Sequence, residues 1–422
     1  MTDVRTAMII GGGIAGPVTA IALRRAGIDA TVYEAHHSRA DGIGGALMLA
    51  PNGLAALRAI GAAATVERVG LPTPRMVMET GAGKRLGTFE DLPGVPTSRT
   101  FARPDLYAAL LEVATAAGVR VEYGKRLAGF DSTADGVLAR FADGTTAAAD
   151  VLVGADGIRS TVRALLDPGA PQPRSVRLLG LGGWVDGSGL RGTGGAMHFA
   201  FGRRAFFGYQ IEDDGRAGWF ANLPSPEPVT AAQARLTPEA EWLRRLRAVY
   251  ADDTLPALAL LDRVPEGGLV NVGTMQDMPP VPVWHRGRAV LVGDAAHATS
   301  PSSGQGASLA IESAVELARC LRDLPLPQAF AAYEALRRHR VEKIIKRTAR
   351  VNSDKAPGPV GRLVRDLTFP IAMRTFYRQE RMMGWVHRHA IDWDAVVASP
   401  GHSPVAGHSP VAGHSPVERA NR

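Results

Sequence analysis

Cysteine is nearly absent from this sequence of 422 residues, which contains only Cys320. A single cysteine excludes an intramolecular disulfide and any metal site built from several thiolates. Cys320 lies within the apolar helical pattern SLAIESAVELARCL, so we expect a small core residue and not a nucleophile. The sequence predicts no metal site.

Long apolar runs are also missing. No stretch reaches the ~18 consecutive apolar residues that a membrane span needs, and no signal-peptide pattern precedes the first apolar segment. These two absences predict a cytoplasmic protein that does not enter a membrane.

Aromatic residues make up only 6% of the sequence and offer few platforms on which nucleic-acid bases could stack. The formal net charge is +7, but much of the excess lies in one helical stretch, LRRHRVEKIIKRTAR. Basic residues without interleaved aromatics do not indicate a nucleic-acid surface, whereas a mildly basic protein suits an anionic cofactor. We therefore expect no nucleic-acid partner.

Glycine, in contrast, is concentrated near the start of the chain in the turn GGGIAGP, residues 11–17. The turn follows the apolar run 7–10, and residues 14–26 then keep apolar positions at helical spacing. The next run, 30–33, is short and rich in β-branched residues, as a buried parallel strand should be. Strand, glycine turn, helix and strand together predict a βαβ unit that binds a dinucleotide.

Each glycine of the motif has a physical reason. Gly11 allows the tight turn, Gly13 lets a diphosphate approach the backbone, and Gly16 lets the helix pack closely on the strand. The amides of Ile14 and Ala15 open the helix, where its dipole favours the negative charge of the phosphates.

Glu34 ends the second strand, 18 residues beyond Gly16. At this spacing a carboxylate can accept hydrogen bonds from the ribose hydroxyls, and it repels a 2′-phosphate. The resident nucleotide should therefore be FAD or NAD and not NADP. The alternative is a glycine turn in a purely structural βα unit.

A second G-x-G-x-x-G match, from Gly187 to Gly192, is followed by the strand-like pattern GGAMHFAFG and not by a helix. We assign it to a loop. The chain should thus hold one dinucleotide-binding unit, and a second nucleotide would bind without a fold of its own.

The predicted fold class is α/β, with a Rossmann-type domain for the dinucleotide, an inserted and mostly antiparallel β-sheet, and C-terminal helices. The turn DDG at 213–215 predicts a hairpin within the inserted sheet. The expected boundaries are 1–72, 99–170 and 271–355 for the dinucleotide-binding domain, 73–98 and 171–270 for the inserted sheet, and 356–398 for the C-terminal helical region.

The last residues, 399–422, repeat GHSPVA with one histidine in each copy: His402, His408 and His414. The repeat is too short and polar to build a core, and nothing fixes the histidines around a metal. We expect a disordered tail whose deletion leaves turnover unchanged.

Three later segments carry a family resemblance. They are FARPDLYAALL (101–111), LVGADGIRSTVR (152–163) and RGRAVLVGDAAHATSPSSGQGASLAIESA (286–314). With the glycine turn and GGALMLAPNGLAALRAIG, they resemble the class A flavoprotein monooxygenases, the para-hydroxybenzoate hydroxylase-like family, over residues 1 to about 350.

The resemblance implies a set of FAD-binding residues around the motifs. Asp294 would accept from a ribityl hydroxyl, and the loop that follows would close on the flavin with its helix pointing at the pyrimidine ring. The loop residues implied are Pro301, Gly304, Gly306 and Ala307. The family also places Arg103 beside FAD and Asp156 near the pyrophosphate; the alternatives are a surface helix arginine and an N-cap for a helix beginning near Ile158. His297 more simply orders the loop backbone than moves protons.

The resemblance further implies the chemistry. NADH or NADPH would reduce non-covalently bound FAD, O2 would add at its C4a position, and the hydroperoxide would transfer one oxygen atom to an electron-rich, aromatic or polyketide-like small molecule. No side-chain nucleophile is needed. A flavin dehydrogenase or reductase without oxygen transfer, and a non-catalytic flavin or small-molecule binding protein, remain as alternatives.

The substrate should lie between the inserted sheet and the flavin, against side chains that alternate along the strands. We select the face that carries Phe207 and Tyr209, with Trp219 from the neighbouring strand; the alternative is that these aromatics only seal the interface between the lobes. Nothing cationic stands out on these strands, which favours a neutral, apolar substrate over a small carboxylate. The protein should be a monomer or a homodimer.

Overall fold

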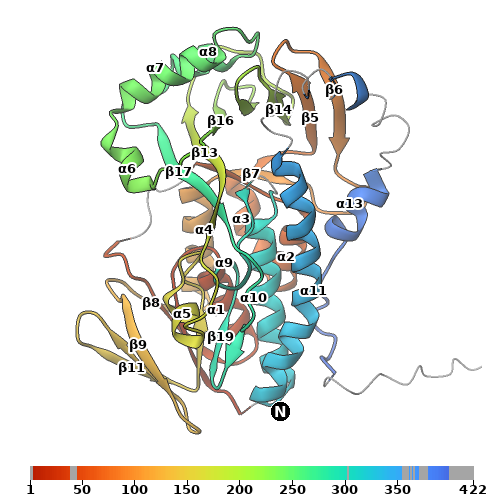
Figure 1. Cartoon of the computed structure of the whole chain (residues 1–422). Helices are drawn as coiled ribbons and strands as arrows, with labels where there is room; N and C mark the ends of the chain where they lie inside the picture. Colours follow the sequence, from red (N-terminus) through yellow and green to blue (C-terminus); the bar gives the residue numbers. More distant parts are fainter. Residues whose placement is uncertain are drawn as a thin grey trace, which may run out of the picture.

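The computed structural model describes residues 3–38, 45–301, 304–353, 361, 364, 366–369 and 379–398. In Figure 1 a lower lobe of long helices packed on a sheet carries an upper lobe built on a second, larger sheet. None of the helices in the described ranges is long and apolar enough to cross a membrane.

The lower lobe is built on a six-stranded sheet, the nucleotide sheet, with the strand order β18-β19-β12-β1-β2-β8. Its strands are β1 (Thr6–Ile10), β2 (Asp29–Tyr33), β8 (Arg120–Glu122), β12 (Val151–Gly154), β18 (His285–Arg286) and β19 (Ala289–Leu291). All pairs are parallel except β18 with β19. The parallel strands therefore end at one edge, which is where ligands bind in such sheets.

Helices cover the nucleotide sheet, and α1 packs against α10, which packs against α2 and α11. Their bounds are α1 (Ala15–Arg25), α2 (Pro51–Ala59), α3 (Ala63–Val69), α4 (Arg103–Ala116), α5 (Thr161–Leu166), α9 (Asp294–His297), α10 (Gly306–Asp323) and α11 (Leu326–Ser353). Cys320 is fully buried in this core, and burial raises the pKa of its thiol to about 12, which confirms a packing role.

Two small sheets complete the lower lobe. One has the order β3-β7-β4, from β3 (Ala46–Leu49), β4 (Leu71–Pro72) and β7 (Arg99–Ala102). The other has the order β11-β10-β9, from β9 (Leu127–Ser132), β10 (Val137–Phe141) and β11 (Thr146–Ala149). The first of them lies between the lobes, because β3 packs against strands of the upper sheet.

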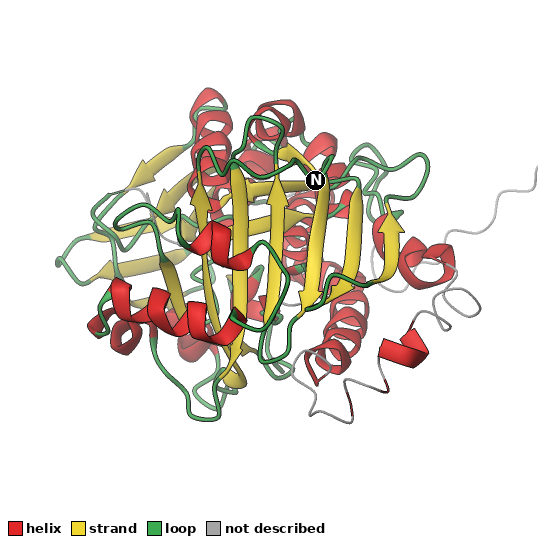
Figure 2. Cartoon of the chain, turned by 90° about the horizontal axis from the view of Figure 1, so that it is seen from above, coloured by secondary structure: helices red, strands yellow, loops and turns green. Residues whose placement is uncertain are grey.

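The upper lobe is a seven-stranded sheet, the large sheet, with the order β17-β13-β16-β15-β14-β5-β6. Its strands are β5 (Arg75–Thr80), β6 (Arg85–Glu90), β13 (Arg174–Val185), β14 (Ala196–Phe201), β15 (Phe206–Ile211), β16 (Ala217–Pro224) and β17 (Val270–Asp277). Only β14 and β5 pair in parallel, so the predicted mostly antiparallel insertion is confirmed, as is the DDG hairpin between β15 and β16. Figure 2 shows the strands side by side between layers of helices.

Residues 187–192 form an irregular connection between β13 and β14, so the second glycine match is a loop as predicted. Three helices, α6 (Ala231–Leu236), α7 (Glu239–Tyr250) and α8 (Ala257–Leu261), then cover one face of the large sheet and share a hydrophobic core with it.

The C-terminal part departs from the predicted helices. Helix α13 (Gln379–His387) is present, but residues 389–398 are not helical and run along α10. They are held there because Arg319 and Arg322 donate to the carbonyl oxygens of Trp393 and Ala395. The GHSPVA repeat lies outside the described residues.

Candidate functional site

The glycine turn has the geometry expected of a cradle. Gly11 has a φ of +108°, and a Cβ there would lie 2.5 Å from the carbonyl oxygen of Ala155. A Cβ on Gly16 would lie 1.9 Å from the carbonyl oxygen of Gly11, so the helix can approach the strand only without one. A Cβ on Gly13 would meet no atom within 4 Å, which leaves room for a ligand against the backbone.

Glu34 closes this turn from the neighbouring strand. Its Oε2 accepts from the Gly12 amide at 2.6 Å, and its Oε1 accepts from the His36 amide at 2.8 Å. The carboxylate thus lies at the end of β2, against the glycine turn.

A cavity of about 450 Å³ opens at this edge of the nucleotide sheet. Its lining includes Gly11, Gly12, Gly13, Glu34, Arg103, Tyr107, Asp156 and Arg159. All eight come from the glycine turn, the end of β2 and the segments 101–111 and 152–163 that the sequence singled out, so segments far apart in the chain converge here.

Asp156 lines the cavity and also binds the start of α5. Its carboxylate accepts from the amides of Thr161 at 2.7 Å and Val162 at 3.0 Å, and from the Ser160 hydroxyl. It therefore holds the first turn of α5, which begins at Thr161 and not near Ile158. Burial raises the pKa of Asp156, and these hydrogen bonds oppose the rise.

Arg103 is half-buried at the start of α4 and is not a surface arginine. Its Nε donates to the Tyr107 hydroxyl at 2.7 Å, and its guanidinium lies over the Tyr107 ring. Burial raises the pKa of Asp294, and the positive charge of Arg103 opposes that rise. The arginine thus acts electrostatically on an aspartate almost two hundred residues away.

Gly293 brings the second motif to the first. It has a φ of +61°, and a Cβ there would lie 3.0 Å from the Cβ of Ala15 in α1 and 3.1 Å from that of Ala310 in α10. This close approach lets both helices pack against the end of β19. Asp294, which follows directly, therefore begins α9 beside the glycine turn.

The loop from Asp294 leads to the start of α10. We call residues 294–301 and 304–306 the flavin loop. Pro301 is exposed, whereas Gly304, Gly306 and Ala307 are half-buried. Gly304 has a φ of +61°, and a Cβ there would lie 3.4 Å from the methyl group of Met48 in β3.

His297 is a buried histidine with a lowered pKa. It is buried beside Trp284, and its Nε2 lies 2.9 Å from the Ser313 hydroxyl. Burial, together with the charge of Arg337, lowers its pKa to about 3. A neutral histidine that orders this part of the chain agrees with the sequence interpretation.

The aromatic residues selected for the substrate lie elsewhere. Phe207 and Trp219 are 0% exposed, stacked on each other, and Phe207 packs edge-on against Tyr250 of α7. The Tyr209 hydroxyl on the same face donates to Glu79 at 2.8 Å. These side chains belong to the core that the large sheet shares with α6–α8.

The opposite side, which we call the phenylalanine face, carries Phe199, Phe206 and Phe220. The ring of Phe220 lies where a Cβ on Gly208 would be, only 2.1 Å from the nearest ring atom, and Gly182 pairs with Phe220 on its other side. In the same way, the Trp184 ring lies over Gly218. Glycines thus allow aromatic rings to lie flat on this face.

The phenylalanine face looks toward the lower lobe. Gln210 of this face donates to the carbonyl oxygen of Pro72 at 3.1 Å and accepts from the Thr73 hydroxyl at 3.0 Å. Strand β3, which contacts β13 and β16, also approaches the flavin loop through Met48. Alternation in the sequence separated the two faces but could not tell which one the helices cover.

A wider hollow of about 870 Å³ lies along the other side of α4. Its arginines are already paired, Arg68 with Glu112 at 3.2 Å and Arg216 with Asp105 at 3.6 Å. Because these charges neutralise each other, the hollow offers no excess charge to an anionic ligand.

Comparison with known proteins agrees with this geometry. Residues 3–186 and 279–348 match the family described as FAD binding domain. The chain belongs to this family. The match covers most of the lower lobe together with β5, β6 and β13 of the large sheet, and it omits β14–β17 and α6–α8.

Curated relatives of this FAD-binding protein are monooxygenases. The aurachin C monooxygenase/isomerase of Stigmatella aurantiaca is 32% identical over 82% of this chain and 88% of its own. The FAD-dependent urate hydroxylase of Klebsiella pneumoniae is 31% identical over 80% of this chain and 87% of its own. A 3-amino-4-hydroxybenzoate 2-monooxygenase of Streptomyces platensis is 32% identical over 87% of this chain and 92% of its own.

Solved structures show the same fold. HpxO of Klebsiella pneumoniae, complexed with FAD and uric acid, superposes with a TM-score of 0.79 at 25% identity, covering 91% of this chain and 96% of that one. The protein is thus an FAD-dependent monooxygenase of the class A type, with the Rossmann-type FAD domain and inserted substrate sheet that the sequence predicted.

Proposed function

We propose that this FAD-dependent, NAD(P)H-consuming monooxygenase hydroxylates an uncharged, planar small molecule of aromatic or polyketide-like structure. The observation that carries the proposal is the chemistry of the central strands: β14, β15 and β16 contain no lysine or arginine. A buried carboxylate needs a cationic partner, and these strands offer none.

We further propose that the phenylalanine face is the substrate side. Phe199, Phe206 and Phe220 supply flat apolar surface for a ring, and stacked or edge-on aromatic pairs add stability beyond the area they bury. The Nε1 of Trp184 is buried and has no hydrogen-bond partner among the described residues, so it can donate to a carbonyl oxygen of the substrate.

For the cofactor we propose the residues that converge at the cavity and the flavin loop. The glycine cradle and the amides at the start of α1 would take the diphosphate, Glu34 the ribose, and Asp294 the ribityl chain. The complete set is Gly11, Gly13, Ile14, Ala15, Gly16, Glu34, Arg103, Asp156, Asp294, Pro301, Gly304, Gly306 and Ala307. The open space at Gly13 and the carboxylate at the strand end fit FAD.

The bound flavin would supply the chemistry, since it accepts electrons from NAD(P)H and passes one oxygen atom of O2 to the substrate. The protein orients the substrate and keeps water from the site. The only titratable side chains on β14, β15 and β16 are His198 and Tyr209, which stack on each other on the face under the helices. No general base therefore faces the substrate from these strands, so the substrate must itself be electron-rich.

The substrates named for the relatives, aurachin C, urate and 3-amino-4-hydroxybenzoate, are ring compounds, which supports an aromatic or heteroaromatic substrate. Our proposal differs in excluding a benzoate-type carboxylate. We also propose that the protein acts in the cytoplasm, where NAD(P)H is available, as a monomer or a homodimer.

A matched set of compounds tests this function. The purified holoenzyme is incubated with neutral aromatic phenols, quinolones and polyketides and with their carboxylated analogues, and NADH and NADPH oxidation is followed. Neutral compounds should stimulate oxidation and acquire one atom from 18O2, as shown by mass spectrometry. Stimulation only by the carboxylates would refute the substrate class. Oxidation without label would indicate a dehydrogenase, and flavin binding without oxidation for any compound would indicate a binding protein.

A further inference from the structure

A buried charged network lies directly behind the flavin loop, with Glu312 of α10 at its centre. Glu312 is 0% exposed. Its carboxylate accepts from Asn52 at 2.6 Å and from the Nε and Nη2 of Arg340 at 2.9 Å, and it forms an ion pair with Arg337 at 2.7 Å. Burial alone would raise the pKa of Glu312, but the two arginines hold it at about 2. Glu312 is therefore ionised, and its negative charge fixes the groups around it.

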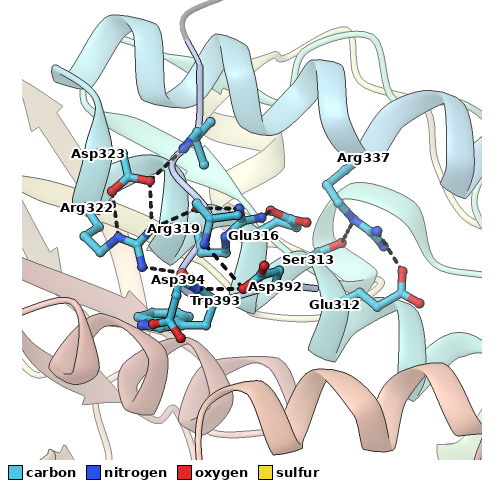
Figure 3. A network of polar contacts seen from close by, with 12 residues as sticks. Glu312, Ser313, Glu316, Arg319, Arg322, Asp323, Arg337, Asp392, Trp393 and Asp394 are labelled. Atoms are coloured by element: carbon cyan, nitrogen blue, oxygen red, sulfur yellow. Dashed lines mark hydrogen bonds and ion pairs between the residues drawn. The ribbon is translucent and has the colours of Figure 1, made fainter. Parts of the chain in front are cut away.

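The network reaches both ends of the flavin loop. At the later end, the Nδ2 of Asn52 also donates to the side-chain oxygen of Gln305 at 3.1 Å. At the earlier end, the Nε of Arg337 donates to the Ser313 hydroxyl at 3.2 Å, and that hydroxyl lies 2.9 Å from His297. Figure 3 shows Arg337 between Ser313 and Glu312. One set of buried contacts thus connects the two ends of the loop.

The chain on both sides of Asn52 packs closely against α10, which fixes the position of Asn52. The amide of Ala50 donates to the Ser308 hydroxyl at 3.1 Å. A Cβ on Gly53 would lie 2.6 Å from that hydroxyl and 2.8 Å from the Ser308 Cα, so the start of α2 can lie on the first turn of α10 only because residue 53 is glycine. Asn52 itself is 0% exposed.

The outer side of the network is closed by the C-terminal segment 379–398, which lies beyond the residues matched by the family. Arg340 donates to the carbonyl oxygens of Trp385 and Val386 in α13, both at 2.9 Å. Further along α10, Asp323 accepts from the Val397 amide at 2.8 Å, and Figure 3 shows the neighbouring contacts around Arg319, Arg322 and Trp393. This segment therefore fixes the position of Arg340, which in turn binds the carboxylate of Glu312.

We propose that Asn52 and Glu312 are positioning residues for the flavin: through Gln305 they fix the start of α10 against the isoalloxazine ring. The inference rests on the proposed placement of FAD at the flavin loop. A buried network that loses one partner leaves a charge or amide unsatisfied, so it holds one geometry and resists others. Catalytic groups tolerate displacements of only about 0.5 Å, and the hydrogen bond from Asn52 restrains the side chain of Gln305.

A double-mutant cycle of Asn52→Ala and Gln305→Ala tests the proposal. Each substitution removes one partner of the same hydrogen bond. The effects of the two substitutions on the free energy of FAD binding should therefore be strongly non-additive. We expect each variant to raise the dissociation constant of FAD by about tenfold. The two-electron reduction potential and the visible absorption bands of the remaining bound flavin should shift, and more NAD(P)H should be lost as hydrogen peroxide.

Arg319→Ala is the matched control. It breaks the ion pair with Glu316 at 2.7 Å and the bond to Ala395 at 2.8 Å, in the middle of the same helix but away from the loop. It should lower the melting temperature and leave the flavin potential and spectrum unchanged.

Two results would overturn the proposal: additive effects in the cycle, or an Asn52→Ala variant whose melting temperature falls while its flavin potential stays at the wild-type value. If Asn52→Ala does not fold, the reduction potential of the flavin in Gln305→Ala provides the test instead. That variant changes a residue at the end of the loop. A wild-type protein that binds no flavin would instead refute the cofactor placement itself.

Discussion

The carboxylate of Glu34 and the backbone amide of Gly12 are joined by a hydrogen bond of 2.6 Å between the second strand and the glycine turn. The acid therefore has a structural partner before any cofactor binds. Because its other oxygen accepts from the His36 amide, the side chain is oriented at the edge of the cavity.

Replacing this acid should weaken flavin binding more than folding. We expect Glu34→Ala to raise the dissociation constant of FAD by at least about tenfold, since hydrogen bonds to a charged group are lost. Fluorescence titration of the apoprotein with FAD measures the effect. Glu122→Ala, at an exposed position on the adjacent strand β8, should bind FAD normally. Equal affinities in the two variants would refute the role of Glu34.

Two glycines of the same turn should respond differently to alanine. Gly16→Ala places a Cβ 1.9 Å from a carbonyl oxygen and should strongly lower the free energy of unfolding. Gly13→Ala meets no atom within 4 Å, so the protein should fold with a normal melting temperature but bind FAD more weakly. Thermal melts of the apoproteins and FAD titrations separate the two effects. A Gly13→Ala variant with wild-type affinity would show that the diphosphate does not lie there.

Loss of Asp294 should yield a colourless protein. The side chain stands at the end of β19 with Arg103 acting on its charge, and we expect its removal to eliminate the contact with the ribityl chain. The ratio of absorbance at the flavin band to that of the protein in purified Asp294→Ala reports the loss. Asp186→Ala, which changes an exposed residue of the upper lobe, should remain yellow. Full flavin retention by Asp294→Ala would contradict the assignment.

The two faces of the large sheet should respond differently to the same change. Phe220→Leu removes a ring from the phenylalanine face and should raise the KM for the substrate by about tenfold with little change in melting temperature. Phe207→Leu removes a ring from the core under α7 and should lower the melting temperature without changing KM. Steady-state kinetics and thermal melts of both variants provide the test. The reverse pattern would instead indicate that the substrate binds the face with Phe207 and Tyr209, which the sequence analysis selected.

Stability should fall in mildly acidic solution. Burial lowers the pKa of His297 from 6.5 to about 3 and that of His389 to about 4. Below pH 6.5 the unfolded chain therefore takes up protons that the folded chain cannot, and the free energy of unfolding decreases as the pH falls toward 4. Melting temperatures measured between pH 7 and 5 should show this decrease. His297→Gln should make the dependence shallower, and His339→Gln, at an exposed position, should not; an unchanged slope for His297→Gln would count against a buried neutral histidine.

Local patterns predicted the elements of the nucleotide unit well. The helix expected over residues 14–26 spans Ala15–Arg25, and the strand expected at 30–33 spans Asp29–Tyr33. The helical patterns SLAIESAVELARCL and LRRHRVEKIIKRTAR lie within α10 (Gly306–Asp323) and α11 (Leu326–Ser353). These elements follow from periodicity and turn residues over short distances, and the Gly11, Gly16 and Glu34 contacts follow from their spacing.

The basic stretch in α11 shows what local patterns could not predict. The sequence showed only a helical stretch that carries much of the net positive charge, but Arg337 is 1% exposed and Arg340 pairs with the buried Glu312. Nothing local to residues 336–350 indicates these partners, because Glu312, Asn52 and the α13 carbonyls come from distant parts of the chain.

The spacing of residues along the chain thus determined which kind of ligand the chain can bind. A glycine turn and an acid at a strand end depend on neighbours only a few residues away. Tertiary packing decided which side of the large sheet faces the flavin loop and which arginines lie inside. Alternation along a strand is the same for either face, and a buried ion pair joins residues whose proximity exists only once the helices have packed.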